Sequence, residues 1–281
     1  FVNGKFLDRN NAKISVFDSG FLLGDGVWRG IRLHNGKLLF LKDHLQRLYD
    51  DAKAISLKIH VNKKELTKYL IQTVKKNKML SDVHIRLIIS RGIKSTPYQD
   101  PSFTISKPTI VIIPEYKKPD EKLYKKGLIL KTVKTIRGPK NVQDPVLNTL
   151  SKLNCILACI EAKKNNADEA LMHDINGNIA TNNSTHFFFI KDNKVYTSTG
   201  NYCVKGITRK NVIDICKANK IRIYQKNFKL KDVMKADEAF VTGTFANIIP
   251  VKKINNKKFS IKKSNLTFII RNLYLEKINS Y

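Results

Sequence analysis

The stretch Lys205-Gly206-Ile207-Thr208-Arg209 determines how the second half of this chain folds. Apolar residues recur at helical spacing from Val212 to Cys216, so the sequence predicts a helix over residues 208–218. The free N–H groups and the positive dipole end at the start of that helix would face an anion at Ile207 and Thr208. A helix N-cap formed by Thr208 is the simpler interpretation of the same residues. The spacing alone leaves both open.

Strand-like and helix-like segments alternate on both sides of this stretch. Alternation of this kind predicts a mixed α/β second domain. The expected strands are residues 128–133, 169–173 and 185–190, and a further expected helix covers residues 150–164.

The first half of the chain has a different pattern. Apolar residues from Leu41 to Ile55 repeat at 4-3-4-3 spacing, which predicts an amphipathic helix, and a second helix is expected over residues 63–78. Buried strands are expected at residues 84–90 and 109–113, which makes this half α+β. A polar stretch with Pro119 then predicts a domain boundary. We therefore expect an N-terminal domain at 1–116, a linker at 117–127 and a C-terminal domain at 128–281.

The charge of the chain is unusual. Its 281 residues include 52 Lys and Arg against 23 Asp and Glu, a net charge of +29, which would suit nucleic acid or an anionic membrane. About 42 of the 52 are Lys, scattered along the chain, whereas base readout and bidentate phosphate binding favour Arg. We attribute most of this charge to background composition and expect no nucleic-acid partner.

Cysteine usage and hydropathy predict a cytoplasmic protein. The four cysteines form no CxxC pair, and Cys155 and Cys159 stand at i,i+4 spacing in an expected helix, as buried free thiols would. The longest apolar runs have strand length, so no membrane span is expected. No signal-peptide pattern opens the sequence.

Several motifs, in order, resemble one enzyme family. Gly24-Asp25-Gly26-Val27-Trp28 and His44-Leu45-Gln46-Arg47-Leu48 in the first half are joined by Ala167-Asp168-Glu169-Ala170-Leu171, the Gly-Ile-Thr-Arg turn and Val241-Thr242-Gly243-Thr244 in the second. Together they look like the class IV (fold type IV) pyridoxal-phosphate aminotransferases, which include branched-chain and D-amino-acid aminotransferases. The resemblance covers nearly the whole chain. It implies a two-domain α+β fold with a smaller N-terminal domain and a larger, barrel-like C-terminal domain, and a homodimer.

The resemblance also implies site residues. Pyridoxal 5'-phosphate would have its phosphate held by Arg47, Ile207 with Thr208, and Thr244. Substrate would be bound by Arg86 and Trp28. His84 and Arg86 are two apart on a predicted strand and so share one face. A surface strand arginine is the simpler interpretation of Arg86.

Three positions depart from the family pattern. The Schiff-base lysine falls on Asn148, the acidic residue facing the pyridine nitrogen falls on Thr181, and a glutamate of the first motif falls on Arg29. An asparagine can neither form the Schiff base nor shuttle the α-proton, and a threonine hydroxyl lacks the charge that keeps the pyridine protonated. We still expect Asn148 and Thr181 to line the cofactor. One change could be introduced by mutagenesis to trap an intermediate, whereas several together indicate a natural divergent subgroup.

Lys152 is the candidate catalytic residue that would replace the missing lysine. If residues 148–152 are helical, Lys152 lies one turn from position 148, about 6 Å along the axis. The alternative is that Lys152 fills a variable basic position of the motif and has no catalytic role.

The sequence thus predicts an aminotransferase-like enzyme that moves an amino group between a small amino acid, branched-chain or similar, and a 2-oxo acid. A divergent member without lysine chemistry, either a non-transaminating enzyme or a phospho-ligand-binding protein, is the second hypothesis.

Overall fold

The computed structural model describes residues 1–118 and 120–281, so Pro119 of the predicted linker lies outside the described residues. The chain divides into two units. Unit 1 comprises Phe1–Lys118 and Leu147–Lys152, and unit 2 comprises Pro119–Val146 and Leu153–Tyr281. A short segment that follows part of unit 2 in the sequence therefore belongs to unit 1. Within the predicted linker, residues 121–126 form a helix, α4 (Glu121–Lys126).

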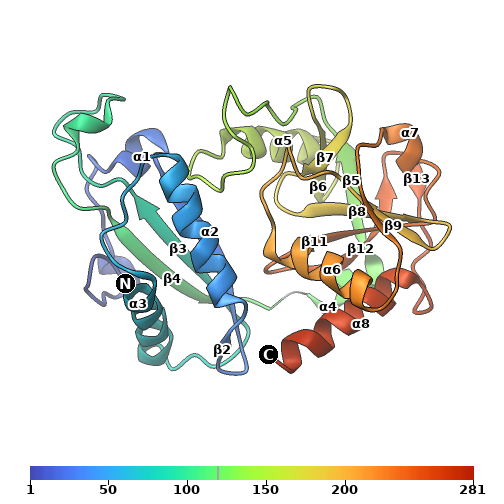
Figure 1. The fold of residues 1–281 in the computed structure, drawn as a ribbon, viewed down its shortest axis with the longest axis horizontal. Coiled ribbons are helices and arrows are strands. Elements are labelled where there is room, and N and C mark those ends of the chain that lie inside the picture. Colours follow the sequence, from blue (N-terminus) through green and yellow to red (C-terminus); the bar gives the residue numbers. More distant parts are fainter. Residues whose placement is uncertain (119) are drawn as a thin grey trace. The chain divides into compact units, whose positions relative to one another are not determined.

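Unit 1 is an antiparallel sheet with two long helices on one face (Figure 1). The strand order is β2-β1-β3-β4. The elements are η1 (Arg9–Asn11), α1 (Ser19–Leu23), β1 (Gly26–His34), β2 (Lys37–Leu38), α2 (Leu41–Ala54), α3 (Lys63–Lys76), β3 (Val83–Ser90), η2 (Pro101–Phe103) and β4 (Ile110–Tyr116).

The core of unit 1 follows from the apolar periodicity of its sequence. Leu45 and Leu48 of α2 and Leu66 and Leu70 of α3 are buried in one cluster with alternate strand residues such as Ile85. Because strand side chains alternate between faces, Trp28, Arg86 and the other residues out of phase with this core lie on the opposite face of the sheet. The two predicted helices and the α+β character of this half are confirmed.

Unit 2 is built on a mixed sheet with the order β10-β9-β8-β11-β12-β5-β6-β7, and β13 pairs with β12. Figure 1 shows α6 lying over strands of this sheet, in agreement with its packing against β11. After α4, the elements are β5 (Leu128–Thr132), α5 (Leu153–Lys164), β6 (Glu169–His173), β7 (Ile179–Asn182), β8 (His186–Lys191), β9 (Lys194–Thr197), α6 (Ile207–Ala218), β10 (Ile223–Gln225), α7 (Leu230–Val233), β11 (Glu238–Gly243), β12 (Asn247–Ile254), β13 (Lys257–Lys258) and α8 (Leu266–Asn279).

The mixed α/β prediction for this half is confirmed. Aromatic residues of β8 and β11 are buried, and Phe188 stacks on Phe240 with ring centroids 4.8 Å apart. This packed sheet positions the start of α6 and the turn after β11, which carry the predicted anion-binding residues.

Candidate active site

Asn148 is fixed to strand β1 of unit 1 by its backbone and its side chain. Its carbonyl accepts the Trp28 N–H at 3.1 Å, and its side-chain amide donates to the Trp28 carbonyl at 3.0 Å. Thr149 forms an antiparallel bridge with Val27. Gly26 permits this close pairing, because a Cβ there would lie 2.7 Å from Leu150 Cδ1. Residues 148–150 therefore continue the sheet edge as extended chain.

This conformation corrects one sequence-based expectation. Helix α5 begins at Leu153, so residues 148–152 are not helical and the predicted helix at 150–164 starts three residues later than expected. The one-turn spacing that would bring Lys152 beside position 148 is absent. The physical reason is that Asn148 and Leu150 use their backbone groups to pair with β1.

A buried ion pair lies directly beside Asn148. Arg29 donates to Asp51 Oδ2 at 2.6 Å, and the Asn148 N–H donates to the same oxygen at 2.8 Å. Arg29 and Asp51 are 1% and 4% exposed. Burial lowers the pKa of Arg29, and Asp51 opposes that shift. The sequence flagged Arg29 as a departure, but the local pattern gave no sign that Asp51 of α2 is its partner.

Helix α2 carries two further cationic or titratable groups. Arg47, the predicted phosphate-binding arginine, is half-buried, and its carbonyl accepts a hydrogen bond from Arg29. His44 is 3% exposed, and burial, then Arg47, Arg29 and His84, lower its pKa to about 3. Sequence analysis missed His44 as a group of interest. The signal was its position one turn before Arg47 on the buried side of the helix.

The two predicted substrate-binding residues, Trp28 and Arg86, lie together on the face of the unit 1 sheet opposite the core formed with α2 and α3. The Arg86 guanidinium carbon lies 4.1 Å from the centre of the Trp28 ring. Arg86 pairs in register with Gly30, and His84 pairs with Arg32. Burial, then Arg86, lower the pKa of His84 to about 4, so a neutral imidazole neighbours the guanidinium at neutral pH. An arginine stacked on an aromatic ring keeps its outer N–H groups available for a carboxylate.

In unit 2, helix α6 begins at Ile207 with Gly206 as N-cap, and no side chain caps it. The interpretation of Thr208 as the N-cap is therefore wrong, because Thr208 is the second residue of the helix. Ile207 and Thr208 are both buried. Any larger residue at position 206 would clash with the His186 ring, because its Cβ would lie only 2.7 Å from His186 Nδ1. An uncapped helix start is a ready site for an anion.

A second group near this helix start lacks a partner. Thr242 of β11 pairs in register with His186, so their side chains are neighbours on one face of the sheet. Its hydroxyl is buried and has no hydrogen-bond partner among the described residues. Thr244, the predicted phosphate-binding residue, lies in the turn that joins β11 to β12. A buried hydroxyl without a partner costs free energy unless a ligand satisfies it.

Thr181, at the position of the family's acidic residue, donates its hydroxyl to the Thr185 carbonyl at 2.9 Å. Its hydroxyl oxygen can then only accept a further hydrogen bond. Close by in the sequence, the Glu169 carboxylate accepts hydrogen bonds from Asn182, Ser184 and Thr185, and burial raises its pKa. In the family resemblance, Glu169 is only one residue of a strand motif. No local sequence pattern indicated its hydrogen bonds with Asn182, Ser184 and Thr185.

The candidate site residues suit the phosphate of pyridoxal phosphate, but they do not supply the lysine and the acid that the family uses at the pyridine ring. The uncapped start of α6 and the unpartnered Thr242 hydroxyl have the chemistry to bind a phosphate group. Position 148 supplies no amino group, and Thr181 supplies no charge at the pyridine nitrogen. No chemical step can therefore be assigned to residue 148.

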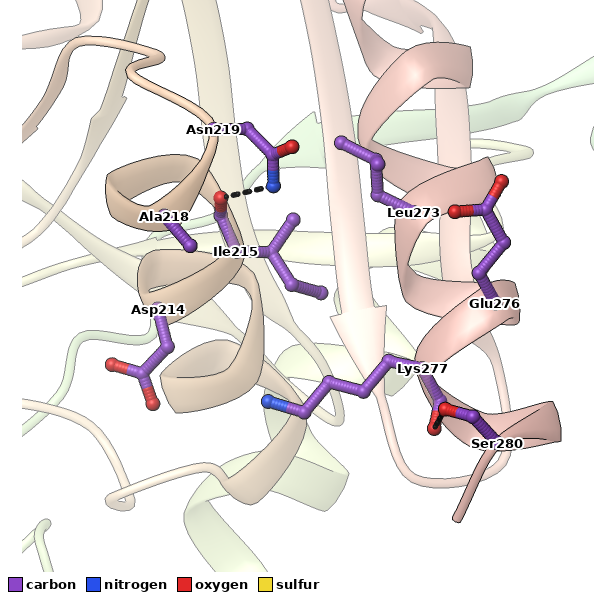
Figure 2. A pocket seen from close by; sticks show the side chains of 8 residues that line it. All are labelled: Asp214, Ile215, Ala218, Asn219, Leu273, Glu276, Lys277 and Ser280. Carbon is purple, nitrogen blue, oxygen red and sulfur yellow. Dashed lines mark hydrogen bonds between the residues drawn. The ribbon is translucent and has the colours of Figure 1, made fainter.

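One groove of unit 2 lies elsewhere. Figure 2 shows this cavity of about 460 Å³, lined by Asp214, Ile215, Ala218 and Asn219 of α6 and its end and by Leu273, Glu276, Lys277 and Ser280 of α8 and its end. It is at the C-terminal end of α6, away from the helix start that carries the anion-binding groups. Within residues 1–118 and 120–281, no cluster of His, Cys, Asp and Glu could hold a metal, and no helix is both long and apolar enough to cross a membrane.

The chain is similar to known aminotransferases in sequence. The family profile described as "Amino-transferase class IV" matches residues 26–254. A putative branched-chain-amino-acid aminotransferase of Methanocaldococcus jannaschii is 37% identical over 264 residues, 94% of this chain and 90% of that protein. A D-alanine aminotransferase of Staphylococcus haemolyticus is 30% identical and covers 92% of this chain and 89% of its own length. A branched-chain-amino-acid aminotransferase-like protein of Arabidopsis thaliana is 34% identical, and its match covers 92% of this chain but 46% of that protein.

Solved structures agree. A T.th. branched-chain amino acid aminotransferase in complex with N-(5'-phosphopyridoxyl)-L-glutamate superposes with a TM-score of 0.91 at 27% identity, over 99% of this chain and 93% of that one. The Thermoproteus uzoniensis branched-chain aminotransferase with norvaline has a TM-score of 0.88 at 26% identity, over 98% and 93% of the two chains. The predicted two-domain fold type IV architecture is confirmed. The chain belongs to the class IV aminotransferases, a family of pyridoxal-phosphate enzymes.

Proposed function

We propose that this enzyme transfers an amino group between a small amino acid, branched-chain or similar, and a 2-oxo acid. One observation carries the proposal: the uncapped, buried start of α6 beside the unpartnered Thr242 hydroxyl, which suits the phosphate of pyridoxal 5'-phosphate. The relatives named as branched-chain and D-alanine aminotransferases support the choice of substrate class.

In this proposal the cofactor phosphate is held in unit 2 by Ile207, Thr208 and Thr244. Arg47, in unit 1, is by itself a further candidate for binding a phosphate. When bound, the cofactor supplies a carbon that takes up the amino group and a ring that withdraws electrons from the substrate. Thr181 would face the ring nitrogen and could serve there only as a hydrogen-bond acceptor, because its own proton is committed to the Thr185 carbonyl. Asn148 lines the cofactor site without reacting.

Arg86 and Trp28 bind the substrate. The indole covers one side of the guanidinium and orients its N–H groups, which then bind a carboxylate as a bidentate pair. The apolar residues on the same face, Ile88 and Val111, suit an aliphatic side chain. An arginine for the carboxylate beside apolar residues for the side chain supports a small aliphatic amino acid as the substrate class.

We propose Lys152 as the lysine that moves the substrate α-proton through its Nζ. Its support is sequence-based: Lys152 is the one lysine of the segment 147–152, which belongs to unit 1 together with position 148. The full chain is incubated with pyridoxal phosphate, reduced with borohydride and mapped by peptide mass spectrometry. We expect the phosphopyridoxyl group on Lys152, lost in Lys152→Ala and retained in Lys68→Ala, a control on the exposed face of α3.

Amino transfer from a branched-chain amino acid to a 2-oxo acid is measured on the same samples. Label on another lysine would reject the role of Lys152 while keeping the cofactor. Absence of both label and transfer would contradict the proposed activity.

The second candidate function is favoured by Asn148, whose amide is already committed to the Trp28 carbonyl. A non-transaminating enzyme or phospho-ligand-binding protein would show phosphate-dependent thermal stabilisation that Arg47→Ala abolishes, without amino transfer. That result would replace the first proposal with the second.

We also propose a cytoplasmic homodimer, without a nucleic-acid or membrane partner. Its support is a stripe on α5 at i, i+3, i+4 and i+7: Leu153, Ile156, Leu157 and Ile160, which are 65%, 52%, 48% and 47% exposed. All four cysteines are free thiols, which suits a reducing compartment. Light scattering should give a particle mass of twice the 32.2 kDa chain mass. The Ile156→Glu variant should have the mass of a single chain. A monomeric wild-type chain would contradict this.

A further inference from the structure

Arg29 and Asn148 share two hydrogen-bond acceptors, and Arg29 has a third, the Arg47 carbonyl, to itself. Asp51 Oδ2 accepts from Arg29 at 2.6 Å and from the Asn148 N–H at 2.8 Å. The Trp28 carbonyl accepts from Arg29 Nη1 at 2.6 Å and from the Asn148 amide at 3.0 Å. Two residues far apart in the sequence thus satisfy the same two oxygens.

We infer that Arg29, Asp51 and Asn148 form one coupled unit, in which Arg29 and Asp51 position residue 148 and exclude a cationic lysine there. The unit holds one buried cation and one buried anion. A carbonyl oxygen has two acceptor sites, and the Trp28 carbonyl uses both. A lysine at position 148 would add a second cation beside the guanidinium, with Asp51 as the only carboxylate bonded to this unit among the described residues.

The electrostatic surroundings strengthen this exclusion. Arg29 is 1% exposed, so water screens its charge little, while position 148 beside it is half-buried. The further groups that act on this region are Arg47 and His44 of α2, which are cationic or titratable, and the more distant Asp50. The departures at positions 29 and 148 are therefore physically linked: the asparagine is the neutral partner that an arginine at 29 requires.

This inference rests on the proposed function only where it treats position 148 as the cofactor-lysine position. The linkage itself concerns the folded chain and can be tested without cofactor. A double-mutant cycle uses Arg29→Gln, Asn148→Lys and their combination, because the combination again contains one cation and one anion. Arg29→Lys combined with Asn148→Lys is the matched control that keeps the second cation.

We expect each single substitution to lower the Tm of the cofactor-free chain by roughly 10 °C, since Arg29→Gln leaves the buried Asp51 carboxylate without its cation and Asn148→Lys adds a second cation beside Arg29. The combined Arg29→Gln/Asn148→Lys chain should have a higher Tm than either single variant. The Arg29→Lys/Asn148→Lys chain should show no such recovery. Additive Tm losses, or equal recovery in the control, would overturn the inference.

The second readout is cofactor attachment at position 148, which a purely structural role would not change. After incubation with pyridoxal phosphate, reduction and peptide mapping, Arg29→Gln/Asn148→Lys should carry at least ~10-fold more label at 148 than Asn148→Lys, because the amine loses its competing cation. Equal labelling would contradict the positioning role. Non-additive Tm changes with no label on any lysine would support the coupled unit and count against the proposed cofactor chemistry, so the two failures are distinguishable.

Discussion

The surroundings of Asn148 in unit 1 and the start of α6 in unit 2 differ in whether their polar groups have hydrogen-bond partners. Around Asn148, a buried arginine, a carboxylate, an amide and a backbone carbonyl bond one another, and Arg29 Nε is the one buried side-chain atom of these groups without a partner among the described residues. At α6, no side chain caps the helix, and the Thr242 hydroxyl has no partner among the described residues. Burying a polar group is tolerated only when it is hydrogen-bonded. The charged and amide groups of the first region are therefore paired within the chain, whereas the second region offers its unpaired groups to a ligand.

We therefore expect the two regions to have different roles, one in stability and the other in ligand binding. Changes around Asn148 should mainly alter the free energy of unfolding, and changes at the start of α6 should mainly alter affinity for phosphate. The variants below test that division.

The largest effect is expected from Asp51→Ala. It leaves the Arg29 guanidinium buried without its carboxylate, and we expect a loss of about 3–5 kcal/mol in the free energy of unfolding. The matched control is Asp214→Ala, which breaks the exposed pair with Lys210 and should cost less than about 0.5 kcal/mol. Denaturant titration measures both. Similar losses in the two variants would show that the network around Asn148 is no more stabilising than a surface ion pair.

Acid should destabilise the chain through unit 1. The pKa of His44 is lowered to about 3 and that of His84 to about 4, so the neutral forms contribute stability that is complete above pH 6.5 and is lost as the pH falls towards those values. His44 alone accounts for about 2 kcal/mol between pH 6.5 and pH 5. Thermal unfolding across this range should therefore show a falling Tm, which His44→Asn flattens.

Glu169, a half-buried acid of unit 2, should change stability with pH in the opposite sense. The pKa of Glu169 is raised, so its contribution is present below its ordinary pKa and is lost as the pH rises through the raised value. It offsets part of the acid loss in unit 1, and Glu169→Gln should make the fall in Tm steeper. A shallower profile in this variant would mean that Glu169 stays ionised throughout.

The smallest effect on stability is expected from Thr242→Val. The substitution replaces an unpartnered buried hydroxyl with a methyl group, so stability should be unchanged or higher by up to about 1 kcal/mol. Affinity for inorganic phosphate or pyridoxal phosphate should fall by about 10-fold, because one hydrogen bond to the anion is lost.

Thr197→Val is the control, because the Thr197 hydroxyl already donates to the Phe187 carbonyl at 2.9 Å. It should cost about 1–2 kcal/mol of stability and leave phosphate affinity unchanged. The reverse outcome for the two threonines, measured by calorimetry and thermal unfolding, would place the phosphate elsewhere.

Each segment that local patterns predicted as a helix or strand contains one in the structure, but strand β1 and helix α8 were among the elements that were not predicted. The helix from Leu41, the helix at residues 63–76 and the strands of both halves follow from apolar periodicity, which is a local property. The prediction of a helix from residue 150 was wrong, since tertiary pairing of residues 148–150 with β1 overrides their local preference. Periodicity cannot detect such pairing, because the partners are more than 100 residues apart.

The sequence by itself determined the family and the residue types at the proposed anion-binding and substrate-binding positions, because these depend on motifs and spacing. It also determined that position 148 carries an asparagine. Only the tertiary structure decided what that asparagine does, because Asp51, Arg29 and the Trp28 carbonyl come from other segments and meet only in the folded chain. The same holds for Thr242, whose missing partner is a property of its buried surroundings and of no sequence pattern.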